Sequence, residues 1–265
     1  MSSPEYANEG VAIVTGASSG IGAVYADRLA ARGYDLVLVA RRFDRLEALA
    51  NRIRGEHGRK ANVIAADLAS DEGVRAVEAA IRDTPHLSVL ANVAGSGALG
   101  PASIVDPLAV EAMLKVNVLA LTRLSLAAAR RLSAAKQGTI INIGSIVALM
   151  PVPGAGTYSG SKAYVLNFSR SLQAELEGSG VKVQVVMPGP VHSEFFGETP
   201  PPFPSGLFMS AEVLVDTALS ALDRGETITF PNLQDETAWA HFDGARSGLV
   251  TKLLQTGQPA PRYAS

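Results

Sequence analysis

The order of apolar runs along the chain constrains its fold more than any other feature of the sequence. Seven short runs of aliphatic and β-branched residues alternate with longer segments that have helical periodicity. The predicted strands are Val11–Val14, Asp35–Val39, Asn62–Ala65, Ser88–Asn92, Thr139–Ile143, Lys182–Val186 and Thr227–Phe230. The predicted helices are Ile21–Arg32, Phe43–His57, Asp71–Arg82, Pro107–Ala134, Thr157–Glu177 and Ala211–Asp223.

This alternation predicts an α/β fold of one particular kind. Strands separated by helices form a parallel sheet with right-handed crossovers, and strands that are apolar throughout are typical of a sheet covered on both faces. We therefore expect a Rossmann-like, doubly wound, seven-stranded parallel sheet with helices on both faces, in a single domain over residues 1–265. Residues 1–10 are expected to be flexible, and residues 232–265 to form a C-terminal helix and tail. The proline-rich segment Phe195–Phe208 is expected to be a substrate lid, with an ordinary surface excursion as the alternative.

Composition excludes several classes of function. The formal net charge is −2, so no strong positive field attracts nucleic acid or an anionic membrane, and we expect neither as a partner. The chain has no cysteine, and its four histidines show no ligand spacing, so no metal site is expected. Residues 1–10 lack the features of a signal peptide, and the longest apolar run, Val116–Leu126, is interrupted by polar residues. We predict a cytoplasmic protein.

A glycine-rich turn follows the first predicted strand and opens the first predicted helix. It reads Thr15-Gly16-Ala17-Ser18-Ser19-Gly20-Ile21-Gly22. Such glycines let the backbone approach a pyrophosphate closely, and the helix N-terminus offers free N–H groups to the anion. The spacing G-x-x-x-G-x-G differs from the common G-x-G-x-x-G, and a tight structural turn is the alternative. Its position between first strand and first helix favours dinucleotide binding.

The end of the second predicted strand bears on the choice of cofactor. An acidic residue here binds the ribose 2′-hydroxyl of NAD, whereas arginine accommodates the 2′-phosphate of NADP. This chain has Arg41 and Arg42, and a guanidinium offers a planar, charge-assisted donor pair to phosphate. The pattern favours NADP(H). Solvent-facing arginines are the alternative, and Asp44 close by keeps NAD open.

Tyr158 and Lys162 form the candidate catalytic pair. They are four residues apart in a predicted helix, so the phenol and the ammonium share one face. A nearby cation lowers the pKa of a tyrosine, which otherwise ionises near 10. Ser145 follows the fifth predicted strand, where its hydroxyl reaches the ligand crevice at the carboxyl edge of the sheet.

Other residues are expected at the same edge of the sheet. Asn92-Val93-Ala94-Gly95 ends the fourth predicted strand, Pro188-Gly189-Pro190-Val191-His192-Ser193 ends the sixth, and Asn117 lies in the long helix between the fourth and fifth. The turn after the sixth strand is suited to holding a carboxamide through its backbone. The substrate pocket is expected to be bounded by Ser96, Ile146–Pro151, His192 and Phe195–Phe208.

In the joint order and spacing of these features the sequence resembles the short-chain dehydrogenase/reductase family, in its compact, NADP-preferring branch. The resemblance covers roughly Val11 to Glu194 and includes Asp67-Leu68 after the third strand. It implies that Ser18, Ser19 and Ile21 contact the phosphates or ribose of the cofactor, that Asp67 and Leu68 contact the adenine, and that Val191 and Ser193 contact the nicotinamide amide. The remaining residues of the implied cofactor site are Gly16, Gly20, Gly22, Arg41, Arg42, Asn92, Ala94, Gly95, Tyr158, Lys162, Pro188 and Gly189. Val93 and Ser193 depart mildly from the family pattern, which commonly has Asn and Thr there.

The resemblance also implies a mechanism. Ser145 orients and polarises a carbonyl, Tyr158 acts as general acid/base, Lys162 lowers the tyrosine pKa and binds the ribose, and Asn117 holds a water. The function predicted is an NADP(H)-dependent oxidoreductase that transfers hydride between nicotinamide and a carbonyl or secondary alcohol, acting as a ketone or aldehyde reductase. An NAD-dependent alcohol dehydrogenase and a non-catalytic dinucleotide sensor are the alternatives.

Two further expectations concern other chemistry and assembly. Ser159–Lys162 also fits the S-x-x-K pattern of acyl-enzyme-forming proteins, but the partner tripeptides S-D-N and K-T-G are absent from the sequence. The resemblance implies a homotetramer or homodimer built on the two long helices. Consistent with that, Leu119, Ala120, Leu124, Ala127 and Ala128 supply more small apolar positions than one face of a sheet requires.

Overall fold

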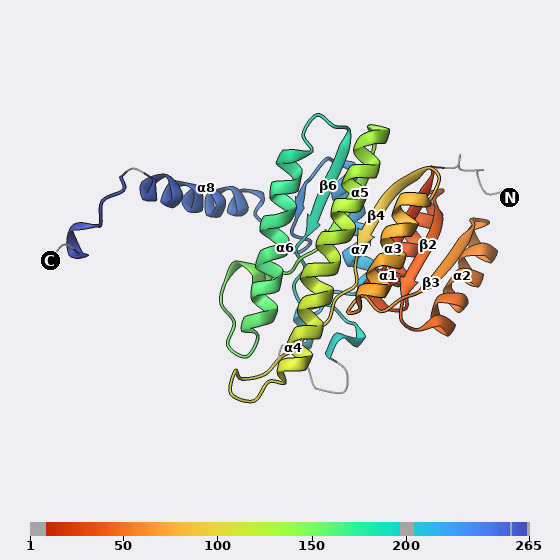
Figure 1. The fold of residues 1–265 in the computed structure, drawn as a ribbon, viewed down its shortest axis with the longest axis horizontal. Coiled ribbons are helices and arrows are strands. Elements are labelled where there is room, and N and C mark those ends of the chain that lie inside the picture. Colours follow the sequence, from red (N-terminus) through yellow and green to blue (C-terminus); the bar gives the residue numbers. More distant parts are fainter. Residues whose placement is uncertain (1–8, 197–203, 255, 264–265) are drawn as a thin grey trace. The chain divides into compact units, whose positions relative to one another are not determined.

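The computed structural model describes residues 9–196, 204–254 and 256–263 (Figure 1). The chain divides into two compact units, Met1–Pro231 and Asn232–Ser265. The first holds seven strands in one parallel sheet, in the order β3-β2-β1-β4-β5-β6-β7. The strands are β1 Val11–Thr15, β2 Asp35–Ala40, β3 Ala61–Ala65, β4 Leu87–Asn92, β5 Gly138–Ile143, β6 Val181–Val186 and β7 Ile228–Thr229. The predicted doubly wound α/β fold and its seven strands are confirmed, although β7 is reduced to two residues.

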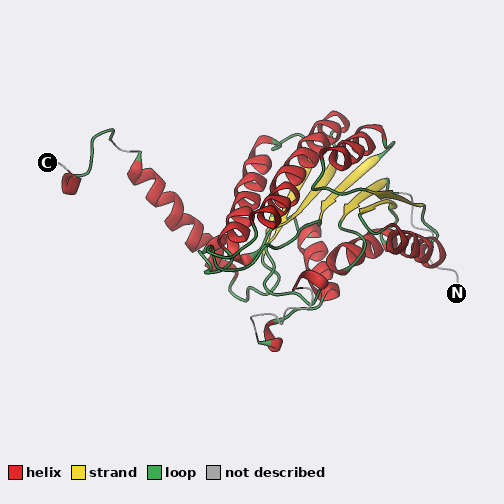
Figure 2. Cartoon of the chain, turned by 60° about the horizontal axis from the view of Figure 1, so that its bottom comes forward, coloured by secondary structure: helices red, strands yellow, loops and turns green. Residues whose placement is uncertain are grey.

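Helices cover both faces of this sheet, which lies between two helical layers in Figure 2. They are α1 Gly20–Ala31, α2 Phe43–His57, α3 Asp71–Asp83, α4 Pro107–Leu114, α5 Leu121–Ala135, α6 Gly156–Glu175 and α7 Ala211–Asp223. Between α4 and α5 a π-helical segment, Lys115–Ala120, continues the same helical stretch. Short 3-10 turns lie at Ile146–Leu149, Glu194–Phe196 and Ser205–Leu207.

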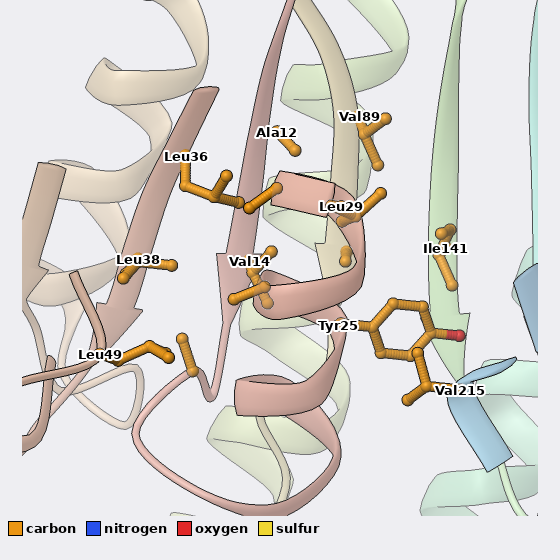
Figure 3. Close-up of a cluster of buried hydrophobic side chains, with 14 of the residues drawn as sticks. Ala12, Val14, Tyr25, Leu29, Leu36, Leu38, Leu49, Val89, Ile141 and Val215 are labelled. Carbon is orange, nitrogen blue, oxygen red and sulfur yellow. The ribbon is translucent and has the colours of Figure 1, made fainter. Parts of the chain in front are cut away.

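Successive side chains of each strand point to opposite faces of the sheet, so the sheet contributes to a hydrophobic core on each face. In β2, Leu36 and Leu38 join one buried cluster, whereas Val37 and Val39 join the other. The first cluster receives α1, α2 and α7, and part of it is drawn in Figure 3, where Tyr25 and Val215 lie beside each other. The second receives α3, α5 and α6. The continuous apolar character of these strands therefore follows from burial on both sides.

The stretch Pro107–Ala135 is long and apolar enough to cross a membrane by length and composition alone, the one such helix in the part of the chain that is described. Its most apolar window has a mean hydropathy of 1.4, and 44% of that window is buried inside the protein. Ala120, Leu124 and Ala128 are fully buried in the core beside the sheet. A core helix of this kind passes the same test, so the evidence for a membrane span is weak.

For three of the five small apolar residues expected at a subunit interface, the predicted location is wrong. Ala120, Leu124 and Ala128 pack within the subunit, because the face of the helix that carries them is the one turned to the sheet. Leu119 is 57% exposed. Only the exposed face of this helix is left for another chain.

The second unit, Asn232–Ser265, contains α8, Glu236–Leu253, and a 3-10 turn at Pro261–Tyr263. Asp235 caps α8, since its carboxylate accepts a hydrogen bond from the Thr237 N–H. None of the residues of α8 is buried. The C-terminal helix predicted for residues 232–265 is present.

The glycine-rich turn after β1 depends on a very close approach of two backbone segments. A Cβ atom on Gly22 would lie 2.2 Å from the carbonyl oxygen of Gly16, far inside van der Waals contact. We predict that Gly22→Ala lowers the free energy of unfolding by at least about 2 kcal/mol, because backbone atoms have to shift. Gly55→Ala in α2 is the matched control, since nothing lies within 4 Å of its Cβ position. It is expected to raise stability by up to about 1 kcal/mol. Urea unfolding measures both, and equal effects of the two variants would contradict the prediction.

Candidate active site

The candidate site lies at the carboxyl edge of the sheet, where the ends of β1 and β4 are joined. The Thr15 hydroxyl oxygen accepts hydrogen bonds from the N–H groups of Val93 (3.0 Å) and Ala94 (3.1 Å). Gly16 follows Thr15 with φ +71°, and a Cβ there would lie 2.8 Å from the backbone of Ala94. The order β3-β2-β1-β4 reverses direction at this point, which is where ligands bind in open α/β sheets.

Tyr158 and Ser145 come together from two different elements. Tyr158 lies in the first turn of α6, and Ser145 precedes the 3-10 turn that follows β5. Burial raises the pKa of the Tyr158 phenol to about 12, and a hydrogen bond with the Ser145 side chain opposes that rise. At neutral pH the phenol is therefore protonated. The predicted meeting of these two hydroxyls is present.

Lys162 lies one helical turn beyond Tyr158, and its side chain is buried. Its Nζ donates a hydrogen bond of 2.9 Å to the carbonyl oxygen of Ile143, the last residue of β5, and lies 5.7 Å from the centre of the Tyr158 ring. Burial lowers the pKa of Lys162 to about 8. The ammonium thus reaches the tyrosine along one helix face, as the four-residue spacing predicts.

Asn117 occupies the centre of the π-helical segment between α4 and α5. Its side-chain amide pairs with the backbone of Ser96: Oδ1 accepts from Ser96 N–H (3.0 Å), and Nδ2 donates to Ser96 C=O (2.9 Å). Nδ2 also lies 3.3 Å from the Ser161 hydroxyl oxygen in α6. A Cβ added to Gly95 would lie 3.3 Å from Asn117 Oδ1 and 3.8 Å from Lys162 Nζ, so Gly95 places the loop after β4 beside both side chains. The sequence predicted an unbroken helix here, so the π-helical segment was not anticipated. Such segments often occur at functional sites.

The glycine-rich turn leads into α1 and carries two hydroxyls. Ser19 is the N-cap residue of α1 but its side chain makes no capping hydrogen bond, in contrast to Ser70 of α3 and Ser210 of α7. The N–H groups of the first turn of α1 are therefore not satisfied by a side-chain cap. Gly20 has φ +52°, and its Cβ position lies 3.5 Å from the Cβ of Ser193, so the turn after β6 lies against this one.

The two arginines at the end of β2 differ in their contacts. Arg42 donates to the hydroxyls of Ser18 (3.0 and 3.2 Å) and Ser19 (2.7 Å), and to the carboxylate of Glu194 (2.7 Å). Arg41 is exposed and has no hydrogen-bond or ion-pair partner among the residues that the structure describes. The sequence analysis missed Glu194, because no local pattern shows that residue 194 returns to the end of β2.

The residues predicted at the ends of β3 and β6 lie near the carboxyl edge. Asp67 is exposed, and its carboxylate accepts from the Ala69 N–H (3.0 Å), whereas Leu68 is buried in the core. Pro188 accepts hydrogen bonds at its carbonyl from Ser145 Oγ (3.5 Å) and from Ile146 N–H (3.0 Å). The backbone after β6 thus lies beside Ser145. Gly189, Val191 and Ser193 continue this turn, and Val191 forms a bridge with Met209.

The side chain of Asn92 is turned away from the predicted cofactor site. Its Nδ2 donates to Ser125 Oγ and to Asn142 Oδ1, both at 2.9 Å, and Asn142 in turn donates to Ser169 Oγ (3.0 Å). These side chains are buried and join β4 and β5 to α5 and α6. The side chain of Asn92 therefore faces the helices and holds the sheet to them. It is not available to a cofactor in the crevice.

Phe195 covers the candidate tyrosine. The centres of the Phe195 and Tyr158 rings are 5.3 Å apart, and a Cβ on Gly97 would lie 2.7 Å from the Phe195 ring, so the ring lies close against Gly97. His192 lies 5.0 Å from Phe208, ring centre to ring centre. Residues 197–203 of the predicted lid segment lie outside the described residues.

One group of side chains among the described residues has the spacing of metal ligands: Asp27, Glu56 and His57. Asp27 already forms ion pairs with Arg28 (2.6 Å) and Arg52 (2.9 Å) and contacts His57 Nε2 (3.0 Å). Arg52 also pairs with Glu56 (3.2 Å). A metal ion would have to displace two guanidinium groups, so this group is better described as an ion-pair network.

Comparison with known proteins agrees with this geometry. Residues 10–202 match the family described as short chain dehydrogenase. The sulfoacetaldehyde reductase of Chromohalobacter salexigens is 38% identical over 186 residues, which cover 69% of this chain and 72% of that protein. The very-long-chain 3-oxoacyl-CoA reductase of Podospora anserina is 36% identical, but the match covers 69% of this chain and only 55% of that longer protein.

Two solved structures resemble the whole fold. A short-chain dehydrogenase from Sphingobium yanoikuyae in complex with NADPH is 40% identical, with a TM-score of 0.91 over 96% of this chain and 100% of that one. The bulky-bulky ketone specific alcohol dehydrogenase from Comamonas testosteroni is 37% identical, with a TM-score of 0.89 over 98% of this chain and 100% of that one. The chain therefore belongs to the short-chain dehydrogenase/reductase family, a family of oxidoreductases, as its resemblance indicated.

The buried ammonium of Lys162 gives a testable dependence of stability on pH. Its pKa in the folded protein, about 8, is below the value of about 10.5 for an exposed lysine. The unfolded chain therefore binds more protons between these pH values, and native stability rises with pH across that window. Below pH 8 the penalty for burying the charge is fully present. Lys162→Met lacks this penalty, so we predict that at pH 7 its free energy of unfolding is raised relative to that of the native protein. This difference in the free energy of unfolding should shrink by about 2–3 kcal/mol as the pH rises to 10.5.

Lys182→Met provides the control, because Lys182 is exposed on β6. Its difference from the native protein should stay within about 0.5 kcal/mol at every pH. Urea unfolding at several pH values between 7 and 10.5 measures all three proteins. A Lys162→Met difference that does not change with pH would show that the ammonium is not desolvated in the folded state.

Proposed function

We propose that the protein is an NADP(H)-dependent oxidoreductase that transfers hydride between nicotinamide and a carbonyl or secondary alcohol. One observation carries the proposal: the Tyr158 phenol, the Ser145 hydroxyl and the Lys162 ammonium converge at the carboxyl end of β5. The physiological direction proposed is reduction, in keeping with the proposed NADP(H) cofactor; the Tyr158 phenol is protonated at neutral pH and is the proton donor.

The residues of the crevice fit a dinucleotide. The N-terminus of α1 has no side-chain cap, so its N–H groups and the positive end of the helix dipole are available to a pyrophosphate. The backbone at Gly16 and Gly20 takes positive φ angles that other residues rarely adopt, which keeps this turn free of side chains. Ser18, Ser19 and Ile21 would hold the phosphates and ribose, and Val191 and Ser193 the nicotinamide amide. Asp67 and Leu68 would lie beside the adenine.

The cofactor supplies the hydride, and the chemistry left to the protein is proton transfer and orientation. Ser145, on the rigid end of β5, donates a hydrogen bond to the substrate oxygen. Tyr158 delivers its proton to the same oxygen as negative charge develops there. Lys162 stabilises the resulting phenolate by its positive charge, which lowers the tyrosine pKa. Asn117 fixes the loop after β4 beside Lys162 and, in this proposal, helps to hold a water that returns a proton.

The substrate proposed is a ketone or aldehyde with apolar substituents. Phe195 packs over Tyr158, and Ile146 and Met150, in the turn after Ser145, are 36% and 65% exposed. Apolar side chains beside the reacting phenol favour an apolar ligand. The similarity to a bulky-bulky ketone specific alcohol dehydrogenase supports this choice.

The preference for NADP(H) rests on Arg41. This guanidinium is exposed at the end of β2 and has no partner among the described residues, so a 2′-phosphate would meet an unpaired cation there. The similar Sphingobium yanoikuyae structure is a complex with NADPH, which supports the same choice.

The proposal extends to assembly and location. We propose a homotetramer or homodimer built on the outer faces of the helical stretch Pro107–Ala135 and of α6; Leu108 and Leu119, in the first of these, are 74% and 57% exposed. The formal net charge of −2 supports a protein without nucleic-acid or membrane partners, and we propose a cytoplasmic location.

The role of Tyr158 is tested by Tyr158→Phe, which removes the hydroxyl and keeps the ring. Loss of the general acid is expected to lower turnover of ketones with NADPH by at least about 10²–10⁴-fold. NADPH affinity should be nearly unchanged. Tyr164→Phe is the matched control on the same helix, since the Tyr164 hydroxyl contacts Thr122 and not the site. Turnover by Tyr158→Phe at the level of Tyr164→Phe would rule out the proposed acid.

The role of Arg41 is tested by Arg41→Ala and by equilibrium binding of NADPH and NADH. Loss of a charge-assisted contact to the 2′-phosphate is expected to weaken NADPH binding about 10- to 100-fold and to leave NADH binding nearly unchanged. Arg82→Ala controls for the loss of one positive charge. Arg82 lies in the last turn of α3 and is paired with Asp83. Equal affinity of the native protein for NADPH and NADH would contradict the preference.

A further inference from the structure

Glu194 contacts a residue of the proposed cofactor site, Arg42, and both its carboxylate oxygens are engaged. Oε2 accepts from Arg42 Nη1 (2.7 Å), and Oε1 accepts from Arg45 Nη1 (2.6 Å). Hydrogen bonds from Arg45 and Arg42 lower the pKa of Glu194 to about 2, so the carboxylate is charged at neutral pH. It thereby joins the turn after β6 to the start of α2.

The arginine that Glu194 binds also contacts the phosphate-binding turn. Nε and Nη2 of Arg42 donate to the hydroxyl of Ser18, and Nη2 donates to that of Ser19 as well. All three nitrogens of the Arg42 guanidinium therefore have partners, and one of these partners is an anion. Arg41 beside it has none among the described residues. A phosphate arriving at this end of β2 finds one free guanidinium and one that is already neutralised.

A carboxylate bound to two guanidinium groups has the charge and the acceptor geometry of a phosphate oxygen pair. We propose that Glu194 competes with the 2′-phosphate of the cofactor for Arg42 and Arg45, and so limits the preference of the site for NADP(H) over NAD(H). This inference rests on the proposed function, because it takes the dinucleotide site at β2 as given.

The competition acts on one part of the cofactor only. A ligand with a 2′-phosphate must take Arg42 from Glu194, or bind through Arg41 with the carboxylate close by. A ligand without this phosphate leaves the Glu194 ion pairs intact. Since the side chains are about half exposed, the pairs are weak, and their effect is a modest factor in affinity.

The test uses isothermal titration of the full-length protein with 2′,5′-ADP and with 5′-ADP, two cofactor fragments that differ in the 2′-phosphate. In Glu194→Gln the affinity for 2′,5′-ADP is expected to rise about three- to tenfold, while the affinity for 5′-ADP stays the same. The control is Glu47→Gln, which removes the same charge from α2 but breaks a pair with Arg54. It is expected to leave both affinities unchanged.

The outcomes separate this inference from the function on which it rests. If the native protein binds 2′,5′-ADP more tightly than 5′-ADP and Glu194→Gln leaves that difference unchanged or reduces it, the competition is overturned and the NADP(H) preference stands. A rise of equal size in Glu47→Gln would attribute the effect to general charge and would also overturn the competition. If the native protein binds both fragments equally, the NADP(H) preference fails; a selective rise for 2′,5′-ADP in Glu194→Gln would then still support the competition, and no such rise would overturn it as well.

Discussion

The hydrogen bond from Lys162 to the carbonyl oxygen of Ile143 is the contact on which the rest of the candidate site depends. It attaches α6, which carries Tyr158, to the last residue of β5, just before Ser145. It helps to fix the helix that carries the Tyr158 phenol against the strand end that precedes the Ser145 hydroxyl. Hydrogen bonds among buried asparagine and serine side chains also join β4 and β5 to α5 and α6. These contacts together hold α6 against the end of β5.

This arrangement buries two ionisable groups, Tyr158 and Lys162, and burial is unfavourable for the charged form of each. Desolvation raises the pKa of Tyr158 to about 12 and lowers that of Lys162 to about 8, so burial disfavours the charged form of each. In the protein alone the Tyr158 phenol is thus a weak acid, and its phenolate is disfavoured. For alcohol oxidation, a further positive charge, that of oxidised nicotinamide, would have to lower the pKa of Tyr158 so that the phenolate can form.

Local patterns in the sequence predicted the fold well, because its determinants are local. Apolar runs of the right length predicted seven strands, and α2 and α7 have the predicted bounds. Tyr158 and Lys162 could be paired because helical spacing fixes their relation. What the sequence did not predict depends on contacts between distant segments. The π-helical turn around Asn117, the inward side chain of Asn92 and the pairing of Glu194 with Arg42 each depend on a residue from another element.

The most direct test of the account is the pKa of Tyr158 itself, measured by NMR on protein with 13C-labelled tyrosine rings and assigned with Tyr158→Phe. In the free protein the phenol should titrate near pH 12. In the complex with NADP⁺ the account predicts a pKa lower by several units, because the cofactor adds a positive charge beside Lys162. A pKa that does not change on binding would contradict the claim that this phenol is the acid/base of the reaction.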